Sequence, residues 1–227
     1  MAEPLRNPEP SPAYTVRRSA RARRVRVTVE ADGAVVVTLP VRAPEREAAA
    51  AVVQLRGWID RRRREAAARV VRLARPEGTV PYLGELLELA PERGRTRAHR
   101  RGSTLRVPAA EPAQREAVER WYRRAARAEV VPRLDAAAAA VGRPYASLTI
   151  RDQRTRWGSC SAKGAMSFNW RLLLAPAEIL DYVVWHEACH LVHLDHSPRF
   201  WAELARHRPG YRDPQRWLRR NGAALHL

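Results

Sequence analysis

The segment VVWHEACHLVHLDHSPRFW, residues 183–201, contains four of the seven histidines of this 227-residue chain. Two of them, His186 and His190, are four residues apart, so a helix would present both imidazoles on one face. Glu187 directly follows the first histidine. This HExxH spacing is typical of a zinc site, in which both histidines bind Zn²⁺ at about 2.0–2.1 Å and the glutamate stays outside the ligand set.

A zinc site with an open position for water and substrate needs a third protein ligand. If the helix continued, His196 would lie about 9 Å along the axis from His190, so it can bind only if the chain turns back. The residues DHSP at 195–198 are turn formers at that point. We favour His196 as the third ligand. The alternatives are His193, which returns to the same helix face, and Glu203, which lies on the following helix.

The surroundings of this pair favour a metal over an ordinary pair of buried histidines. The preceding residues YVVW, 182–185, are apolar and should bury the start of the helix. Burial of two histidines and a glutamate without a partner is costly, and a bound Zn²⁺ would remove that cost. Glu187 is then expected to be the catalytic residue, which takes a proton from zinc-bound water and passes it to the leaving group.

Three residues outside the histidine segment bear on the site. Arg156, in the segment RWGSC, is the candidate substrate-binding residue, because a guanidinium can hold a carbonyl, a carboxylate or a phosphate. The alternative for Arg156 is a structural pairing with a buried acid. Cys160 and Cys189 are expected to be small buried apolar residues and not metal ligands.

The chain is strongly basic, with 42 Lys and Arg residues against 24 Asp and Glu residues and a formal net charge of +18. Such a charge permits binding to nucleic acid. The excess is spread along the chain and is almost entirely arginine, since Lys163 is the only lysine. Runs such as DRRRREAAAR, residues 60–69, are usually solvated helix faces. Nucleic acid therefore stays an open alternative as a partner, but the positive charges are not clustered in a way that supports it.

The sequence predicts a cytoplasmic protein without a membrane partner. Its longest apolar runs are too short to cross a bilayer. The first residues, MAEPLRNPEPSPAY, are rich in proline and lack the apolar stretch of a signal peptide. Two cysteines cannot form a disulfide framework, which fits a reducing compartment.

Alternating patterns of strand and helix precede the histidine segment. The expected elements are a hairpin at 24–39 with a turn at Asp32-Gly33, helical sequence at 43–74 that Gly57 could interrupt, two or three short strands at 79–108, a long helix at 112–141, strands within 147–170, and a helix at 177–192. Pro132 should kink or split the long helix, and Gly142 should end it. Ser197 and Pro198 are typical of the start of a further helix.

Residues 155–201 resemble the YgjP-like metallopeptidases, which are relatives of the SprT-like zinc proteases. The segments RWGSC, N-x-R-L, DYVVxHE-x-CH and HSPRFW occur in that order, and weaker similarity extends towards both ends of the chain. The resemblance implies that His186, His190 and His196 bind Zn²⁺ and that Glu187 is catalytic. It does not by itself identify the substrate.

Pattern and resemblance together predict an α+β fold. We expect an N-terminal β-rich half and a C-terminal zincin-like half, in which the metal-binding HExxH helix packs on a small antiparallel sheet. The expected parts are a disordered tail at 1–13, a β-rich region with one long helix at 14–110, and a metallopeptidase-like domain at 111–227.

Three hypotheses for the function follow. The first is a zinc-dependent hydrolase that cleaves a peptide or protein, with the RWGSC strand aligning an extended substrate by strand addition. The second keeps the metal but cleaves the phosphoanhydride of a nucleoside triphosphate, held by arginines in the absence of a phosphate-binding loop. The third is a nucleic-acid-binding protein with a vestigial metal site, for which binding would depend on salt and not on Glu187.

Overall fold

The computed structural model describes residues 12–30, 33–72, 75–153 and 155–227. Contacts divide the chain into two compact units that meet between Ala74 and Arg75. The boundary expected at residue 110 instead lies inside the second unit, because the strands at 79–108 pack against the long helix that follows them. The tail expected at 1–13 falls almost entirely outside the described residues.

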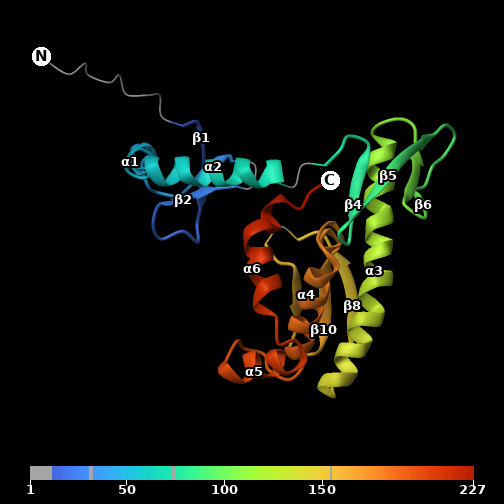
Figure 1. Ribbon diagram of the computed structural model, residues 1–227. Coiled ribbons are helices and arrows are strands. Elements are labelled where there is room, and N and C mark those ends of the chain that lie inside the picture. Colours follow the sequence, from blue (N-terminus) through green and yellow to red (C-terminus); the bar gives the residue numbers. More distant parts are fainter. Residues whose placement is uncertain (1–11, 31–32, 73–74, 154) are drawn as a thin grey trace, which may run out of the picture. The chain divides into compact units, whose positions relative to one another are not determined.

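The first unit is a small three-stranded sheet with two helices (Figure 1). Its elements are β1 (Tyr14–Ser19), β2 (Arg26–Val29), β3 (Val35–Pro40), α1 (Arg46–Gln54) and α2 (Arg56–Arg72). The predicted hairpin is present as the antiparallel pair β2–β3, while β1 pairs in parallel with the other edge of β3. Alternate residues of β3, Val35 and Val37 among them, are buried in a core with Val52. The helical segment breaks at Leu55, two residues before the expected Gly57.

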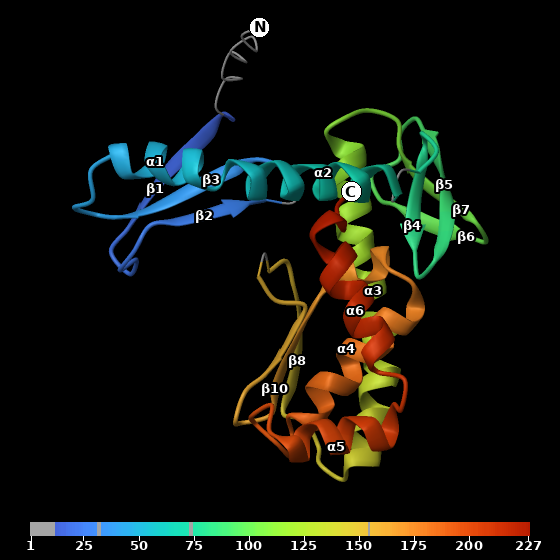
Figure 2. The same ribbon diagram turned by 60° about the vertical axis from the view of Figure 1, so that its left-hand side comes forward.

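The second unit contains two sheets and the remaining helices. Its elements are β4 (Thr79–Tyr82), β5 (Glu85–Glu92), β6 (His99–Arg101), β7 (Thr104–Pro108), α3 (Ala113–Val141), β8 (Ser147–Arg151), β9 (Gly158–Cys160), β10 (Ala165–Asn169), the 3₁₀ helix η1 (Trp170–Leu174), α4 (Ala177–Cys189), α5 (Pro198–His207), α6 (Arg212–Asn221) and η2 (Gly222–Ala224). The first sheet has the order β4-β5-β7-β6 and the second β8-β10-β9. Helix α3 runs beside α4 and contacts strands of both sheets (Figures 1 and 2).

Helix α3 is continuous through Pro132, so of the two expected effects of this proline, a kink or a split, the split does not occur. A proline inside a helix removes one backbone hydrogen bond and costs about 3 kcal/mol. Val130 and Leu134, on either side of it, are fully buried against the core, and this burial offsets the cost. Gly142, with φ of 71°, ends the helix as expected.

The sheet beside α4 is mixed and not antiparallel as expected. Strand β10 pairs antiparallel with β9 but parallel with β8. The sequence between β8 and β10 crosses to the far edge of the sheet before it returns, and this path is what makes the two strands parallel. As a result β9, the strand of this sheet that packs against α4, lies at an edge of the sheet.

Among the described residues, no helix is both long enough and apolar enough to cross a membrane.

Candidate metal centre

Helix α4 ends three residues earlier than its sequence pattern suggests. It runs from Ala177 to Cys189 and buries Leu180 and Val184 against the core. Its last turn tightens, because the backbone N–H of His190 donates to the carbonyl of Glu187 at 3.2 Å, a three-residue step. His186 and Glu187 therefore lie in the last full turn of the helix, and the chain is free to change direction after His190.

The chain then turns back and brings His196 to the helix. The side chain of Asp195 accepts a hydrogen bond from the backbone N–H of Ser197 at 3.3 Å, which is a typical Asx turn. Pro198 occupies the first position of α5, where its fixed φ suits a helix start. Phe200, two residues later, is fully buried and anchors α5 against α4.

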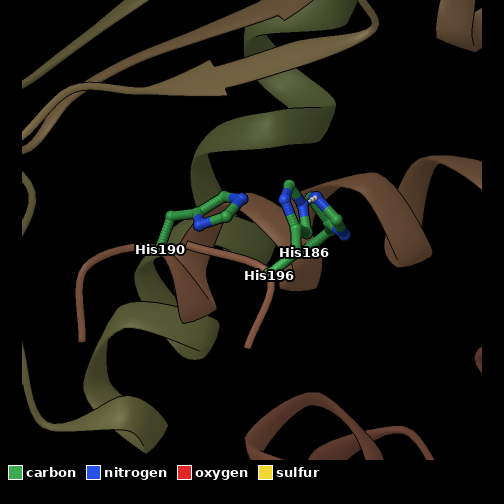
Figure 3. Close-up of side chains that lie close together, drawn as sticks. All are labelled: His186, His190 and His196. Carbon is green, nitrogen blue, oxygen red and sulfur yellow. Dashed lines mark hydrogen bonds between the residues drawn. The ribbon is translucent and has the colours of Figure 1, made fainter. Parts of the chain in front are cut away.

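The three imidazoles converge on one point (Figure 3). One ring nitrogen from each of His186, His190 and His196 lies within 4.8 Å of the others. The Nε2 atoms of His186 and His196 are 2.9 Å apart. Phe200 supports the group, since its ring centroid lies 4.5–4.9 Å from each of the three imidazole centroids. Nitrogen atoms so arranged suit a metal ion that prefers imidazole ligands.

The main chain fixes which nitrogen of His190 is available. Nδ1 of His190 lies 2.8 Å from the backbone carbonyl oxygen of His193. A carbonyl can only accept, so Nδ1 carries the proton and donates it. Nε2 of His190 therefore keeps its lone pair, which is the state that a metal ligand requires.

Two of the three imidazoles, those of His186 and His190, have lowered pKa values. Burial, together with the neighbouring His190 and His196, lowers the pKa of His186 to about 3. Burial likewise lowers the pKa of His190. Nδ1 of His186 is buried without a hydrogen-bond partner, and within the described ranges no carboxylate forms an ion pair with any of the three rings. A group of imidazoles that ranges from buried His190 to exposed His196, with an unsatisfied nitrogen on His186, fits a metal ion better than it fits a structural cluster.

Glu187 is buried beside this group and faces the edge strand β9. A Cβ atom added to Gly158 would lie 2.6 Å from Cγ of Glu187, so only glycine leaves room for the carboxylate there. Burial raises the pKa of Glu187 to about 8, whereas Arg156 and a hydrogen bond from the backbone of Cys160 act to lower it. The glutamate is thus a strong base that is held in place by backbone and not by other acids.

Comparison with known proteins adds a family to this geometry. The family described as "YgjP-like, metallopeptidase domain" matches residues 23–221. The chain belongs to the YgjP-like metallopeptidase family. Among solved structures, the crystal structure of the metallopeptidase zymogen of Pyrococcus abyssi abylysin is 25% identical and covers 39% of this chain and 91% of that one, with a TM-score of 0.36. No curated protein matches.

Family membership confirms the resemblance that the sequence suggested and makes the chain, in general terms, a metal-dependent peptidase. The fold is a mixed α/β arrangement with several small mixed sheets. A metal ion is implied by the family, and the three histidines are a group that could hold it.

The two rival ligands of this YgjP-like chain have other contacts. Glu203 on α5 pairs with Arg206 at 2.6 Å and with His207 at 3.1 Å. His193 contributes its backbone carbonyl to His190, and its ring is not part of the converging group. Neither Cys160 nor Cys189 belongs to that group, and burial raises the pKa of both thiols. Arg156 is exposed and lies close enough to Glu187 to affect its pKa.

Several residues around the centre were not anticipated from the sequence. A cavity of about 410 Å³ opens beside the histidines, and its lining includes His186, His196, Gln215 and Arg219. Gln215 and Arg219 are four residues apart on α6, so the helical period could have grouped them. Nothing in the sequence could have indicated that α6 packs beside α4, because that contact depends on the fold.

Proposed function

We propose that this chain is a zinc-dependent metallopeptidase of the zincin type, in which His186, His190 and His196 hold the metal and Glu187 is the catalytic base. The observation that carries the proposal is the convergence of three imidazole nitrogens within 4.8 Å of one another, next to a buried glutamate. Zn²⁺ is the favoured ion because three nitrogen ligands leave it one open position in a tetrahedral site.

When bound, Zn²⁺ supplies a Lewis acid that polarises the scissile carbonyl and lowers the pKa of water. Glu187 takes the proton from the attacking water and then gives it to the leaving amine. Burial raises the pKa of Glu187, which makes its carboxylate a stronger base than an exposed glutamate. Gly158 and the backbone of Cys160 hold the carboxylate in position.

Strand β9 is the proposed docking strand for an extended peptide. The backbone N–H of Asn169 donates to the carbonyl of Trp157, and the N–H of Ser161 donates to that of Ala165, so these residues pair inward with β10. In an antiparallel ladder the residues in between, Gly158 and Cys160, direct their backbone groups to the other side. That side is the edge next to Glu187, where a peptide could add as a strand.

Arg156 is the proposed substrate-positioning group on that edge. It directly precedes Trp157 and Gly158, is exposed, and interacts electrostatically with Glu187. Within the described part of the chain, no carboxylate forms an ion pair with Arg156. Its guanidinium is therefore available to a substrate carbonyl or carboxylate.

The test is to measure metal content and hydrolysis in one preparation of the full chain. We expect about one zinc per chain, cleavage of unstructured peptides, loss of cleavage with a chelator, and recovery with added Zn²⁺. Nucleoside triphosphates and nucleic acid are offered in parallel. Metal-dependent release of phosphate or pyrophosphate without peptide cleavage would replace the proposal with a phosphoanhydride hydrolase. Salt-dependent nucleic-acid binding without any hydrolysis would replace it with a binding module.

A further inference from the structure

The cavity beside the metal centre is suited to take part of the substrate. Its volume of about 410 Å³ falls within the usual range of ligand pockets, roughly 300–1,000 Å³. His186 and His196 form one wall, so whatever fills the cavity lies next to the proposed metal. A substrate whose scissile bond is at the metal would therefore place a neighbouring group in this cavity.

Aromatic side chains form the other walls and are held firmly. Trp157 packs against the backbone of Gly222, the first residue of η2 after α6, since a Cβ atom added there would lie 2.9 Å from the indole. Trp201 stacks on Tyr211, with ring centroids 5.5 Å apart and planes 20° apart. Both tryptophans line the cavity. Rigid walls of this kind define a shape and give selectivity at low entropic cost.

The lining of the cavity also includes polar and positively charged side chains. These are Gln215 and Arg219, one turn apart on α6. Arg216 on the same helix pairs with Asp213, whereas among the described residues no carboxylate forms an ion pair with Arg219. Burial raises the pKa of Tyr182, which also lines the cavity, whereas Gln215 and Arg219 act to lower it.

We propose that this cavity binds a carboxylate of the peptide substrate, with Arg219 as the residue that selects it. The inference rests on the proposed peptidase function and extends it to specificity. The carboxylate belongs either to an aspartate or glutamate next to the scissile bond or to the free C-terminus of the peptide. The aromatic walls accommodate its methylene groups, and Arg219 and Gln215 donate hydrogen bonds to its oxygens.

Charge complementarity supports an acidic group over a neutral one. A guanidinium that faces a partly enclosed apolar space gains more from a carboxylate than it would in open water. Hydrogen bonds between charged groups contribute about 1.5–3 kcal/mol, which corresponds to roughly a 10- to 100-fold preference. The basic chain as a whole, with a net charge of +18, also attracts acidic peptides.

The experiment compares peptides that differ only in one group. One series carries Glu, Gln, Leu or Lys at each position beside the scissile bond. A second series ends one residue beyond the bond with either a free carboxylate or an amide. For the wild type we expect kcat/KM for Glu over Gln, or for carboxylate over amide, to be about 10-fold or more. The series that shows the preference identifies the source of the carboxylate.

Arg219→Leu tests the assignment, and Arg220→Leu is its matched control. Arg220 is the next residue on α6 and does not line the cavity. We expect Arg219→Leu to reduce the preference to near one and Arg220→Leu to retain it. The inference is overturned if the wild type shows no preference, if the preference survives Arg219→Leu, or if both variants lose it equally. In each of these cases peptide cleavage, and with it the proposed function, stands.

Binding separates a failure of this inference from a failure of the proposed function. The zinc-loaded protein with Glu187→Gln is titrated with the same peptide pairs by calorimetry. If the wild type cleaves no peptide, the proposed function fails. Tighter binding of the acidic peptide that depends on Arg219 would still support the carboxylate site, and equal binding of both peptides would overturn it. Binding of nucleoside triphosphate at Arg219 in place of any peptide would also overturn it.

Discussion

Two sets of side chains on and beside α4 contain histidine, one built around His207 and one formed by His186, His190 and His196, and their hydrogen bonds are satisfied in opposite ways. His207 stacks on Trp185 at a centroid distance of 4.8 Å, and its Nε2 lies 3.1 Å from the carboxylate of Glu203. His186, the residue after Trp185, has a buried Nδ1 without a partner and faces two other imidazoles. The first group is complete within the protein, and the second needs something from outside.

This contrast explains why one histidine group is structural and the other is a candidate site. A carboxylate beside an imidazole provides both a hydrogen bond and an opposite charge, as Glu203 does for His207. Three converging imidazoles without an acid offer one another ring nitrogens and no opposite charge. Both groups place an imidazole against aromatic rings, so the polar partner of each ring is the more informative observation.

The largest effect is expected at the third ligand. His196→Ala should abolish peptide hydrolysis and lower zinc affinity by more than the roughly 10- to 100-fold that removal of a merely orienting partner costs. His207→Ala, in the complete group, should retain zinc. Zinc content by mass spectrometry after dialysis against a weak chelator measures both. Equal zinc loss in the two variants would remove the distinction between the groups.

The second-largest effect is expected on hydrolysis when Glu187 is replaced, with Glu203 as the comparison. Glu187→Gln should retain zinc, because the residue is not a ligand, and should lower hydrolysis by roughly 10²–10⁴-fold, because an amide cannot accept the proton. Glu203→Gln is the matched control and should keep most of the activity. Steady-state kinetics on the best peptide, together with zinc content, provide the measurement. Zinc loss in Glu187→Gln would instead make this residue a ligand or a structural acid.

A smaller loss is expected when the support of Glu187 is changed. Gly158→Ala would place a methyl group 2.6 Å from Cγ of Glu187 and push the carboxylate away from the reacting water. A misplacement of about 1 Å can cost 10²-fold in rate, and zinc should still bind. Gly210→Ala is the control, since a Cβ there meets nothing within 4 Å. The same kinetic assay decides, and a fully active Gly158→Ala variant would contradict the proposed position of Glu187.

The smallest effect is expected on stability. Glu203→Gln removes the charge that pairs with Arg206 and His207 at a partly exposed site. We expect the free energy of unfolding to fall by about 0.5–1 kcal/mol, as is usual for such pairs. Urea denaturation of the metal-free protein measures this change without a contribution from zinc binding. A loss of several kcal/mol would show that the His207 group does more than hold α5 on α4.

The sequence was informative where a local pattern determines the outcome. The β2–β3 hairpin, the end of α3 at Gly142 and the turn at Asp195–Pro198 each depend on residues that are neighbours in the chain. The convergence of His196 with the HExxH pair could be anticipated because the residues DHSP, 195–198, favour a turn. The position of Gly57, by contrast, did not determine the break between α1 and α2, which lies at Leu55.

What depends on distant segments could not be predicted. The parallel pairing of β8 with β10 follows from the path of the chain across the sheet and not from the composition of either strand. Glu203 pairs with His207, which argues against Glu203 as a metal ligand. This contact is seen only in the structure of α5. Arg219 carries no motif, and its relation to the metal centre depends on how α6 packs against α4.

The hydrogen bond from His190 to the carbonyl of His193 has a consequence for how this site tolerates change. The acceptor is a main-chain atom, so no substitution at position 193 other than one that alters the backbone path can delete it. Insertion or deletion of one residue between 190 and 196 would shift the carbonyl that His190 binds and would displace His196 at the same time. The spacing between the second and third histidines is therefore constrained by length, while this hydrogen bond places no demand on the side chain at position 193.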